Sequence, residues 1–248
     1  MVSGDAARGD TVCASMIPAD LLDTATMPYR KSGLFTYHFA RGKLSRDPVF
    51  AFLLQQGLIG ENAEVVDIGC GQGLLASLLT AATGVASLPP GWPAVRQIKS
   101  YFGVDLMQAD ITRATKALGH LSPRVRFVQG DMCECTFPEC DAVVILDVLH
   151  YVPIGAQNAV IDRAIAALRA NGRLLLRIGD ERGGLGFAMS QWADRVVTRV
   201  RGHRVTPTFC RPLDDWVQLL QGRGLNVQAI PMHKGTPFAN ILLRADKS

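Results

Sequence analysis

Short apolar runs alternate with segments of helical pattern through the middle of the chain. The runs at 65–68, 101–106 and 124–132 are rich in Val, Ile and aromatic residues, which is typical of short strands. The run at 141–150 is apolar at nearly every position, as expected for a strand covered on both faces. A helical pattern follows the first run after five intervening residues and extends from Leu74 to Thr80. This alternation predicts an α/β fold built around a parallel sheet.

The same pattern continues toward the C-terminus. It predicts a helix at 156–170 that ends at Asn171-Gly172, a fifth strand at 172–178, a last helix at 213–221, and two further strands at 226–230 and 238–243. The connection at 179–212 is longer than a minimal loop and carries a helical pattern of its own through Val200. We therefore expect this connection to be an insertion into an otherwise regular fold.

The residues before the first strand predict a separate helical segment. Asp47 is a suitable N-cap and Pro48 a suitable first residue for a helix that runs to Gln56. Phe35 and Phe39 are spaced by one helical turn, and we expect both to pack into the core. We divide the chain into a lid at 1–60 and a main domain at 61–248.

A glycine-rich turn directly follows the first predicted strand. Asp67 is followed by Gly69, Gly71 and Gly73, and the next helix begins at Leu74. Glycines in such a turn let backbone N–H groups approach a ligand with no Cβ in the way. The dinucleotide fingerprint would require a glycine at position 74, so this spacing argues against a dinucleotide site.

Two later strands are predicted to end in carboxylates. Asp105 ends the second strand and Asp131 ends the third. The carboxyl ends of parallel strands meet at one edge of the sheet, and ligands bind there in open α/β folds. An alternative is that both residues only cap the segments that follow them, as Asp commonly does.

The acidic residue followed by glycines at every second position resembles motif I of the S-adenosylmethionine-dependent methyltransferases with a Rossmann-like fold. The resemblance implies a doubly wound, mostly parallel, seven-stranded sheet that closes with an antiparallel C-terminal hairpin. It also implies S-adenosyl-L-methionine as the cofactor, held by the loop at Gly69, Gly71 and Gly73. In this family the acidic residue, here Asp67, usually lies near the methionine end of the cofactor.

The resemblance extends, position by position, to the ends of the other strands. It implies that Asp105 accepts hydrogen bonds from the ribose hydroxyls and that Leu106 offers an apolar face to adenine. Asp131 would accept from the adenine amino group, and the backbone N–H of Met132 would donate to a ring nitrogen. Asp147 would lie close to the methionine portion.

The turn after the fourth strand bears on the methyl acceptor. Residues 147–151 lack the paired prolines that the family uses to methylate base amines, and they resemble the small-molecule methyltransferases. We predict that His150 is a general base, because a His that titrates near neutrality can deprotonate a phenol. We further predict that Tyr37 and His38 orient the acceptor from the lid, with the 179–212 insertion nearby. A structural role for His150 remains the alternative.

Two phrases, at 35–44 and 235–240, resemble methyltransferases that accompany bacterial aryl-polyene or fatty-acid-like pigment synthesis. This resemblance implies a hydroxyaryl or acyl-type acceptor, methylated at oxygen or at the neighbouring ring carbon. A basic cluster fits either of two roles, a favourable set of charges at a helix end or a docking surface for an acidic carrier protein. Its members are Arg195, Arg199, Arg201, His203 and Arg204.

Composition and charge limit the classes of partner and the cellular location that we expect for this protein. The net charge of the 248 residues is only +4, so we expect no nucleic-acid partner. The N-terminus shows no secretory signal pattern, and the longest nearly apolar run, 74–88, is too short for a bilayer, so we expect a soluble cytoplasmic protein. The cysteines at 133, 135 and 140 lack zinc-site spacing, so no metal is expected. An oligomer is compatible with the sequence.

Two rival functions belong to other classes. A short-chain NAD-dependent oxidoreductase is disfavoured, because the third fingerprint glycine and a Tyr-x-x-x-Lys pair are absent. A catalytically silent subunit that binds the cofactor and a protein partner is compatible with every motif described above.

Overall fold

The computed structural model of this protein describes residues 16–85, 88–95, 97–179, 209–232 and 240–248. The described residues form one seven-stranded sheet in the order β3-β2-β1-β4-β5-β7-β6. Its strands are β1 (Glu64–Ile68), β2 (Ser100–Asp105), β3 (Val125–Gln129), β4 (Cys140–Leu146), β5 (Leu168–Gly179), β6 (Leu225–Pro231) and β7 (Asn240–Lys247). In this order, neighbouring strands are parallel from β3 through β2, β1 and β4 to β5. Strand β7 pairs antiparallel with both β5 and β6. The predicted Rossmann-like fold with its antiparallel C-terminal hairpin is confirmed.

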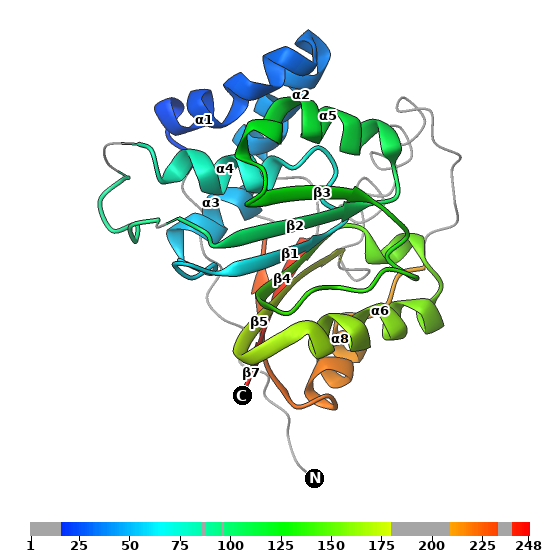
Figure 1. The fold of residues 1–248 in the computed structure, drawn as a ribbon. Helices are drawn as coiled ribbons and strands as arrows, with labels where there is room; N and C mark the ends of the chain where they lie inside the picture. Colours follow the sequence, from blue (N-terminus) through cyan, green and yellow to red (C-terminus); the bar gives the residue numbers. More distant parts are fainter. Residues whose placement is uncertain (1–15, 86–87, 96, 180–208, 233–239) are drawn as a thin grey trace.

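Helices cover both faces of the sheet (Figure 1). One face carries α4 and α5 with the N-terminal helices outside them, and the other carries α6 and α8. The helices are α1 (Ala19–Thr26), the 3-10 helix η1 (Met27–Ser32), α2 (Leu34–Arg46), α3 (Pro48–Gln55), α4 (Leu74–Ala82), α5 (Gln108–Leu118), α6 (Ile154–Ala167) and α8 (Leu213–Gln221). Two further 3-10 turns are η2 (Gly119–Leu121) and η3 (Leu149–Tyr151).

Successive side chains of each strand point to opposite faces of the sheet, so the core is divided into two layers. Val65 and Val144 pack with the N-terminal helices, α4 and part of α5. Their neighbours Val66 and Val143 pack on the opposite face with α6 and α8. Because both faces are covered, the central strands are apolar at almost every position, which explains the continuous apolar runs in the sequence.

The fifth strand begins earlier than its pattern predicts. Helix α6 ends at Ala167, and Leu168 already pairs with Cys140. The register then shifts, and Asn171 takes a left-handed backbone conformation with φ 60°. The Asn-Gly pair that was expected to end the helix therefore lies inside an irregular start of β5.

The N-terminal helices are hydrogen-bonded to the first helix of the main domain. The Ser77 hydroxyl of α4 donates to the carbonyl of Ala25 at 2.6 Å. The Tyr29 hydroxyl, which is fully buried, donates at 2.9 Å to the carbonyl of Gln72 in the glycine-rich loop. The N-terminal segment is thus part of the support of that loop. A domain division at residue 60 stays a prediction.

The expected packing of Phe35 is wrong. Its side chain is 62% exposed, whereas Phe39 is partly buried against the core. Helix α2 buries Tyr37, Ala40 and Leu44. This spacing places the three residues on one face of the helix. Phe35 precedes the buried Tyr37 by two positions, which is a rotation of about 200° around the helix axis, so its side chain lies on the opposite face.

Replacing Tyr29 by Phe should lower the free energy of unfolding by about 1–3 kcal/mol, because the buried Gln72 carbonyl loses its donor. Urea unfolding followed by circular dichroism measures this change. Phe35→Leu is the control, since that side chain is exposed and should leave stability nearly unchanged. Equal stability of Tyr29→Phe and the wild type would contradict the proposed support of the loop.

Candidate cofactor and acceptor site

The glycine-rich loop joins β1 to α4 through three left-handed residues. Gly69, Gly71 and Gly73 have φ values of 79°, 53° and 73°. A Cβ built on Gly69 would lie 2.4 Å from a methyl of Val148, and one on Gly73 would lie 2.6 Å from the Phe127 ring. Apart from Gly71 itself and its two neighbours in the chain, no described residue has an atom within 4 Å of a Cβ on Gly71. The loop is therefore closely packed at both ends and open at Gly71.

The Asp105 carboxylate ties the end of β2 to this open glycine. One carboxylate oxygen accepts from the backbone N–H of Gly71 at 2.8 Å, and the other accepts from that of Met107 at 2.8 Å. The structure thus brings together Asp105 and Gly71, two residues that were each predicted to bind the cofactor. The neighbouring Leu106 is 58% exposed, which leaves an apolar side chain in solvent beside them. The ribose and adenine roles of these two residues stay predictions.

Asp131 and Met132 follow β3 at the same edge of the sheet. The Asp131 carboxylate accepts from the backbone N–H of Cys133 at 2.8 Å, so it caps its own turn. The Met132 carbonyl accepts from Arg163 of α6 at 2.6 Å. These contacts fix the turn in place. They match the capping alternative for Asp131, and adenine recognition by this pair stays a prediction.

Asp67 lies beneath the loop. Its side chain is buried and accepts a hydrogen bond from the Tyr101 hydroxyl of β2. Burial raises the pKa of Asp67 to about 7, although the hydrogen bond from Tyr101 opposes the shift. The carboxylate therefore faces β2 inside the core layer, and its placement near the methionine end stays a prediction.

Asp147 is held by a buried network of ion pairs. It follows β4 directly and has a left-handed backbone with φ 58°. Arg177 of β5, whose side chain is 1% exposed, binds Asp147 through two nitrogens and Asp47 through two. Lys43 of α2 lies 2.7 Å from Asp47 and 4.0 Å from Asp147. Sequence reasoning found Asp147 but missed the other charged partners of this network.

The charges in this network stabilise one another. Burial alone would raise the pKa of Asp47, but the Arg177 and Lys43 cations hold it well below its usual range. Burial would likewise lower the pKa of Arg177, and the carboxylates of Asp147 and Asp47 raise it instead. A sequence signal for the network existed, since an Arg inside an apolar strand requires a buried acidic partner.

His150 lies in the 3-10 turn η3 and not in β4 itself. Its ring centroid is 4.1 Å from that of Tyr151, and its carbonyl accepts from the Phe209 N–H at 2.7 Å. Burial lowers the pKa of His150, and the nearby Asp147 opposes part of that shift. The imidazole is therefore neutral near pH 7, which is the form that accepts a proton.

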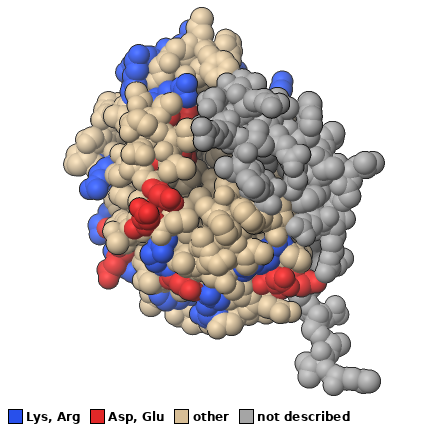
Figure 2. Space-filling view, turned by 90° about the vertical axis from the view of Figure 1, so that its right-hand side faces the viewer, with Lys and Arg blue, Asp and Glu red and all other residues tan. Residues whose placement is uncertain are grey.

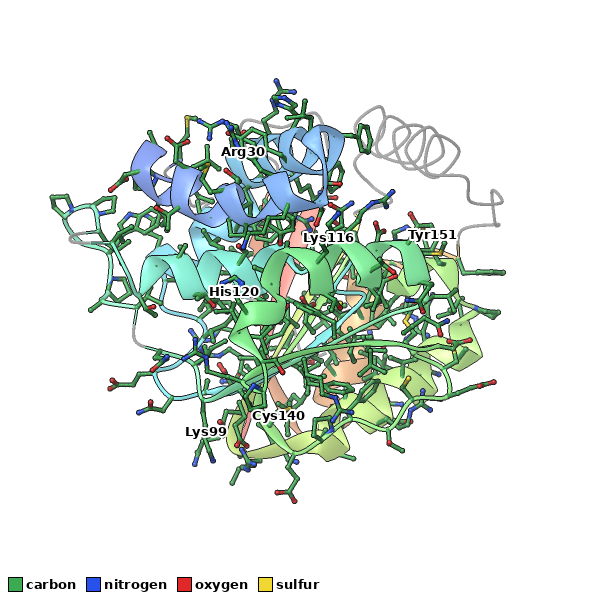
Figure 3. The ribbon with its side chains drawn as sticks, turned by 45° about the horizontal axis from the view of Figure 1, so that its top comes forward. Arg30, Lys99, Lys116, His120, Cys140 and Tyr151 are labelled. Carbon is green, nitrogen blue, oxygen red and sulfur yellow. The ribbon has the colours of Figure 1, made fainter. Side chains whose placement is uncertain are left out.

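Tyr37 and His38 make their observed contacts within the N-terminal helices. Their rings meet edge to face at 5.1 Å, and the Arg30 guanidinium lies 4.6 Å above the Tyr37 ring. Figure 3 shows Arg30 on the outer side of these helices, with Tyr151 at the edge of the sheet. Tyr37 is buried and His38 exposed. The observed contact from α2 to Asp147 is made by Lys43.

The strand ends define the two edges of the sheet. Lys99 and Cys140, at the starts of β2 and β4, lie on the side away from Tyr151 (Figure 3). Figure 2 views the molecule from the carboxyl-end side and shows a described face that is largely uncharged at its centre, with both basic and acidic groups scattered around it. The basic cluster at 195–204, most of the 179–212 insertion and most of the 235–240 phrase lie outside the described residues.

Other features of the described residues concern metals and membranes. They contain no group of three or more His, Cys, Asp or Glu side chains that could hold a metal ion. Five described cysteines, at 70, 133, 135, 140 and 210, are free thiols. Within the same part of the chain, no helix is both long enough and apolar enough to cross a membrane.

Comparison with known proteins identifies the family. Residues 37–230 match the family model described as a methyltransferase domain. Carboxy-S-adenosyl-L-methionine synthase of Chromohalobacter salexigens is 32% identical over 127 residues, which cover 48% of this chain and 43% of that protein. This chain therefore spans less than half the length of that curated relative.

Solved structures show the same fold. An O-methyltransferase family protein from Burkholderia thailandensis has a TM-score of 0.60 and 18% identity, covering 88% of this chain and 62% of its own. Magnesium protoporphyrin IX methyltransferase from Synechocystis PCC 6803, solved with bound SAH, has a TM-score of 0.57 and 20% identity. The match covers 92% of this chain and 97% of that protein. Because the family model spans more than half of the sequence, this chain belongs to the methyltransferase domain family.

Proposed function

We propose that this enzyme transfers a methyl group from S-adenosylmethionine to a small hydroxyaryl or acyl-type acceptor, at oxygen or at a neighbouring carbon. The observation that carries the proposal is the position of the half-buried His150 in the turn at Leu149–Tyr151, which Asp147 and Val148 join to the end of β4. The same turn packs against the glycine-rich loop through Val148. A base in this position lies beside the proposed donor site.

The residues at the sheet edge fit the proposed cofactor. The space at Gly71 admits a ligand against the backbone, and Asp105 stands beside it with a carboxylate that hydroxyl groups can donate to. The exposed Leu106 offers an apolar surface for a planar ring. When bound, the cofactor supplies an electrophilic methyl group on a sulfonium.

The remaining chemistry belongs to the protein. Deprotonation by His150 would convert a phenol to a phenolate, whose negative charge is shared between the oxygen and the ortho carbon. The same base thus serves O- and C-methylation. We assign acceptor orientation to His38, the exposed member of the Tyr37–His38 pair, with Tyr37 supporting it through ring contact.

A labelled-methyl assay tests this function. Hydroxyaryl acids, free and attached to a carrier protein, should become labelled, and the carrier-bound form should be preferred if the 195–204 cluster docks a carrier. Binding of the donor with no transfer to either form would favour a catalytically silent subunit. Transfer only to acceptors without an acidic hydroxyl or enol would contradict the acceptor class.

A second candidate follows from the likeness to a carboxy-S-adenosyl-L-methionine synthase over 127 residues. In that case the chain would make or use a carboxylated form of the donor. Mass spectrometry of the cofactor and of the product distinguishes the candidates, because a carboxymethyl group is heavier than a methyl group. An unmodified cofactor and a methylated product support methyl transfer.

Gly71→Val should abolish binding of both S-adenosylmethionine and S-adenosylhomocysteine, because its side chain would occupy the space beside the backbone. Isothermal titration calorimetry measures the loss. Gly91→Val is the matched control, since Gly91 also has a positive φ and an open Cβ direction but precedes the start of β2. Unchanged affinity of Gly71→Val would place the cofactor elsewhere.

Asp105→Asn should weaken cofactor binding by about 1.5–3 kcal/mol, the range for a hydrogen bond to a charged group. A 2′-deoxy analogue of S-adenosylhomocysteine makes the test specific for the ribose. The analogue should bind the wild type more weakly than the parent compound but should bind Asp105→Asn equally well. Asp131→Asn is the control in which the penalty for the missing hydroxyl should persist. A penalty that persists in Asp105→Asn as well would remove the ribose role.

His150→Ala should keep cofactor affinity and lose about 10²–10⁴-fold in turnover, the usual contribution of a positioned base. Activity should partly recover as the pH approaches about 10, where an ordinary phenol ionises unaided. Because burial lowers the pKa of His150, wild-type activity should persist at slightly acidic pH. His38→Ala is the comparison and should raise KM more than it lowers kcat. Normal turnover of His150→Ala at every pH would assign His150 a structural role.

A further inference from the structure

Four charged side chains, one of them Asp147, come from three separate parts of the chain and contact one another. Lys43 comes from α2, Asp47 from the junction of α2 and α3, Arg177 from β5, and Asp147 from the end of β4. We call these four residues the charge network. Two cations and two anions give it a formal charge of zero.

Arg177 fixes where the Asp147 carboxylate points. Its Nε donates to one oxygen of Asp147 at 2.8 Å, and a second nitrogen contacts the other oxygen. Asp147 is one of three described residues other than glycine with positive φ, a conformation that needs support from its surroundings. The adjoining Val148 packs on Gly69, so the residue next to Asp147 in the chain contacts the glycine-rich loop.

Asp47 joins the N-terminal segment to this arrangement. Its carboxylate contacts two nitrogens of Arg177 and also accepts at 3.2 Å from the Val49 N–H as the N-cap of α3. Lys43 lies one helical turn earlier, 2.7 Å from the same carboxylate. Its side chain is 39% exposed and that of Asp147 is 29% exposed, whereas Asp47 and Arg177 are 10% and 1% exposed, so Lys43 lies on the solvent side of the buried Asp47–Arg177 pair.

We propose that Lys43, Asp47 and Arg177 are positioning residues that set the net charge around Asp147, and that the N-terminal segment thereby sets the preference of the site for a cationic donor over its neutral product. The inference rests on the proposed function, which places Asp147 near the methionine portion of the donor. The donor carries a positive sulfonium, whereas the demethylated product carries an uncharged thioether. A change of one charge in the network therefore acts on the sulfonium and leaves the thioether nearly unaffected.

The experiment measures the ratio of the dissociation constants of S-adenosylhomocysteine and S-adenosylmethionine by calorimetry. Asp47→Asn gives the network a charge of +1 and should lower this ratio by on the order of tenfold, because it disfavours the donor. Lys43→Gln gives it a charge of −1 and should raise the ratio. The double variant restores neutrality and should return the ratio toward the wild-type value.

Asp23→Asn is the matched control. It makes the same substitution in the same N-terminal helices, where Asp23 pairs with Arg41 at an exposed position. The ratio in this variant should equal that of the wild type. If Asp47→Asn does not fold, the solvent-side Lys43→Gln variant still tests the direction of the effect.

A purely structural role predicts a different result. Misplacement of the site would weaken donor and product binding together and leave the ratio unchanged, and that result would overturn the inference. The proposed function fails separately, through a wild type that binds both ligands but transfers no methyl group. A wild type that binds neither ligand would overturn the inference and the cofactor site together.

Discussion

The guanidinium of Arg177, buried between two carboxylates, connects the sheet to the N-terminal helices. Arg177 projects from β5 into the layer beneath the N-terminal helices, where an unpaired cation would be strongly destabilising. Its partners therefore have to be present in the folded state. One partner, Asp147, ends β4, and the other, Asp47, begins α3. The requirement to pair one charge thus brings the end of β4 and the start of α3 together at β5.

Local hydrogen bonds at the sheet edge do more than cap turns. Asp105 and Asp131 each accept from a backbone N–H two residues ahead. Such bonds orient a carboxylate before any ligand arrives, so that less side-chain freedom is lost on binding. Capping and ligand recognition are therefore compatible roles for one residue. The two roles that the sequence presents as alternatives for Asp105 and Asp131 do not exclude each other.

The fold could be predicted from sequence because its signals are local. The β-branched runs of β1 and β4 and the Gly69–Gly73 spacing each occupy fewer than ten residues. The charge network could not be predicted in this way, since Arg177 meets Asp47 across 130 residues and Asp147 across 30. Phe35 shows the same limit within one helix. Its spacing from Phe39 was clear, but which face of α2 is buried depends on helices packed against it.

The long separation between Asp47 and Arg177 has a consequence for how the protein is made. During synthesis, α2 and α3 leave the ribosome long before β5 exists, because the chain emerges from its N-terminus. The Asp47 carboxylate must then stay hydrated until Arg177 has been added, 130 residues later. The N-terminal helices can contact the glycine-rich loop and α4 early, through Tyr29 and Ser77, whereas the Asp47–Arg177 pair can form only after most of the sheet has been translated. The protein therefore completes this charge network late in its own biosynthesis.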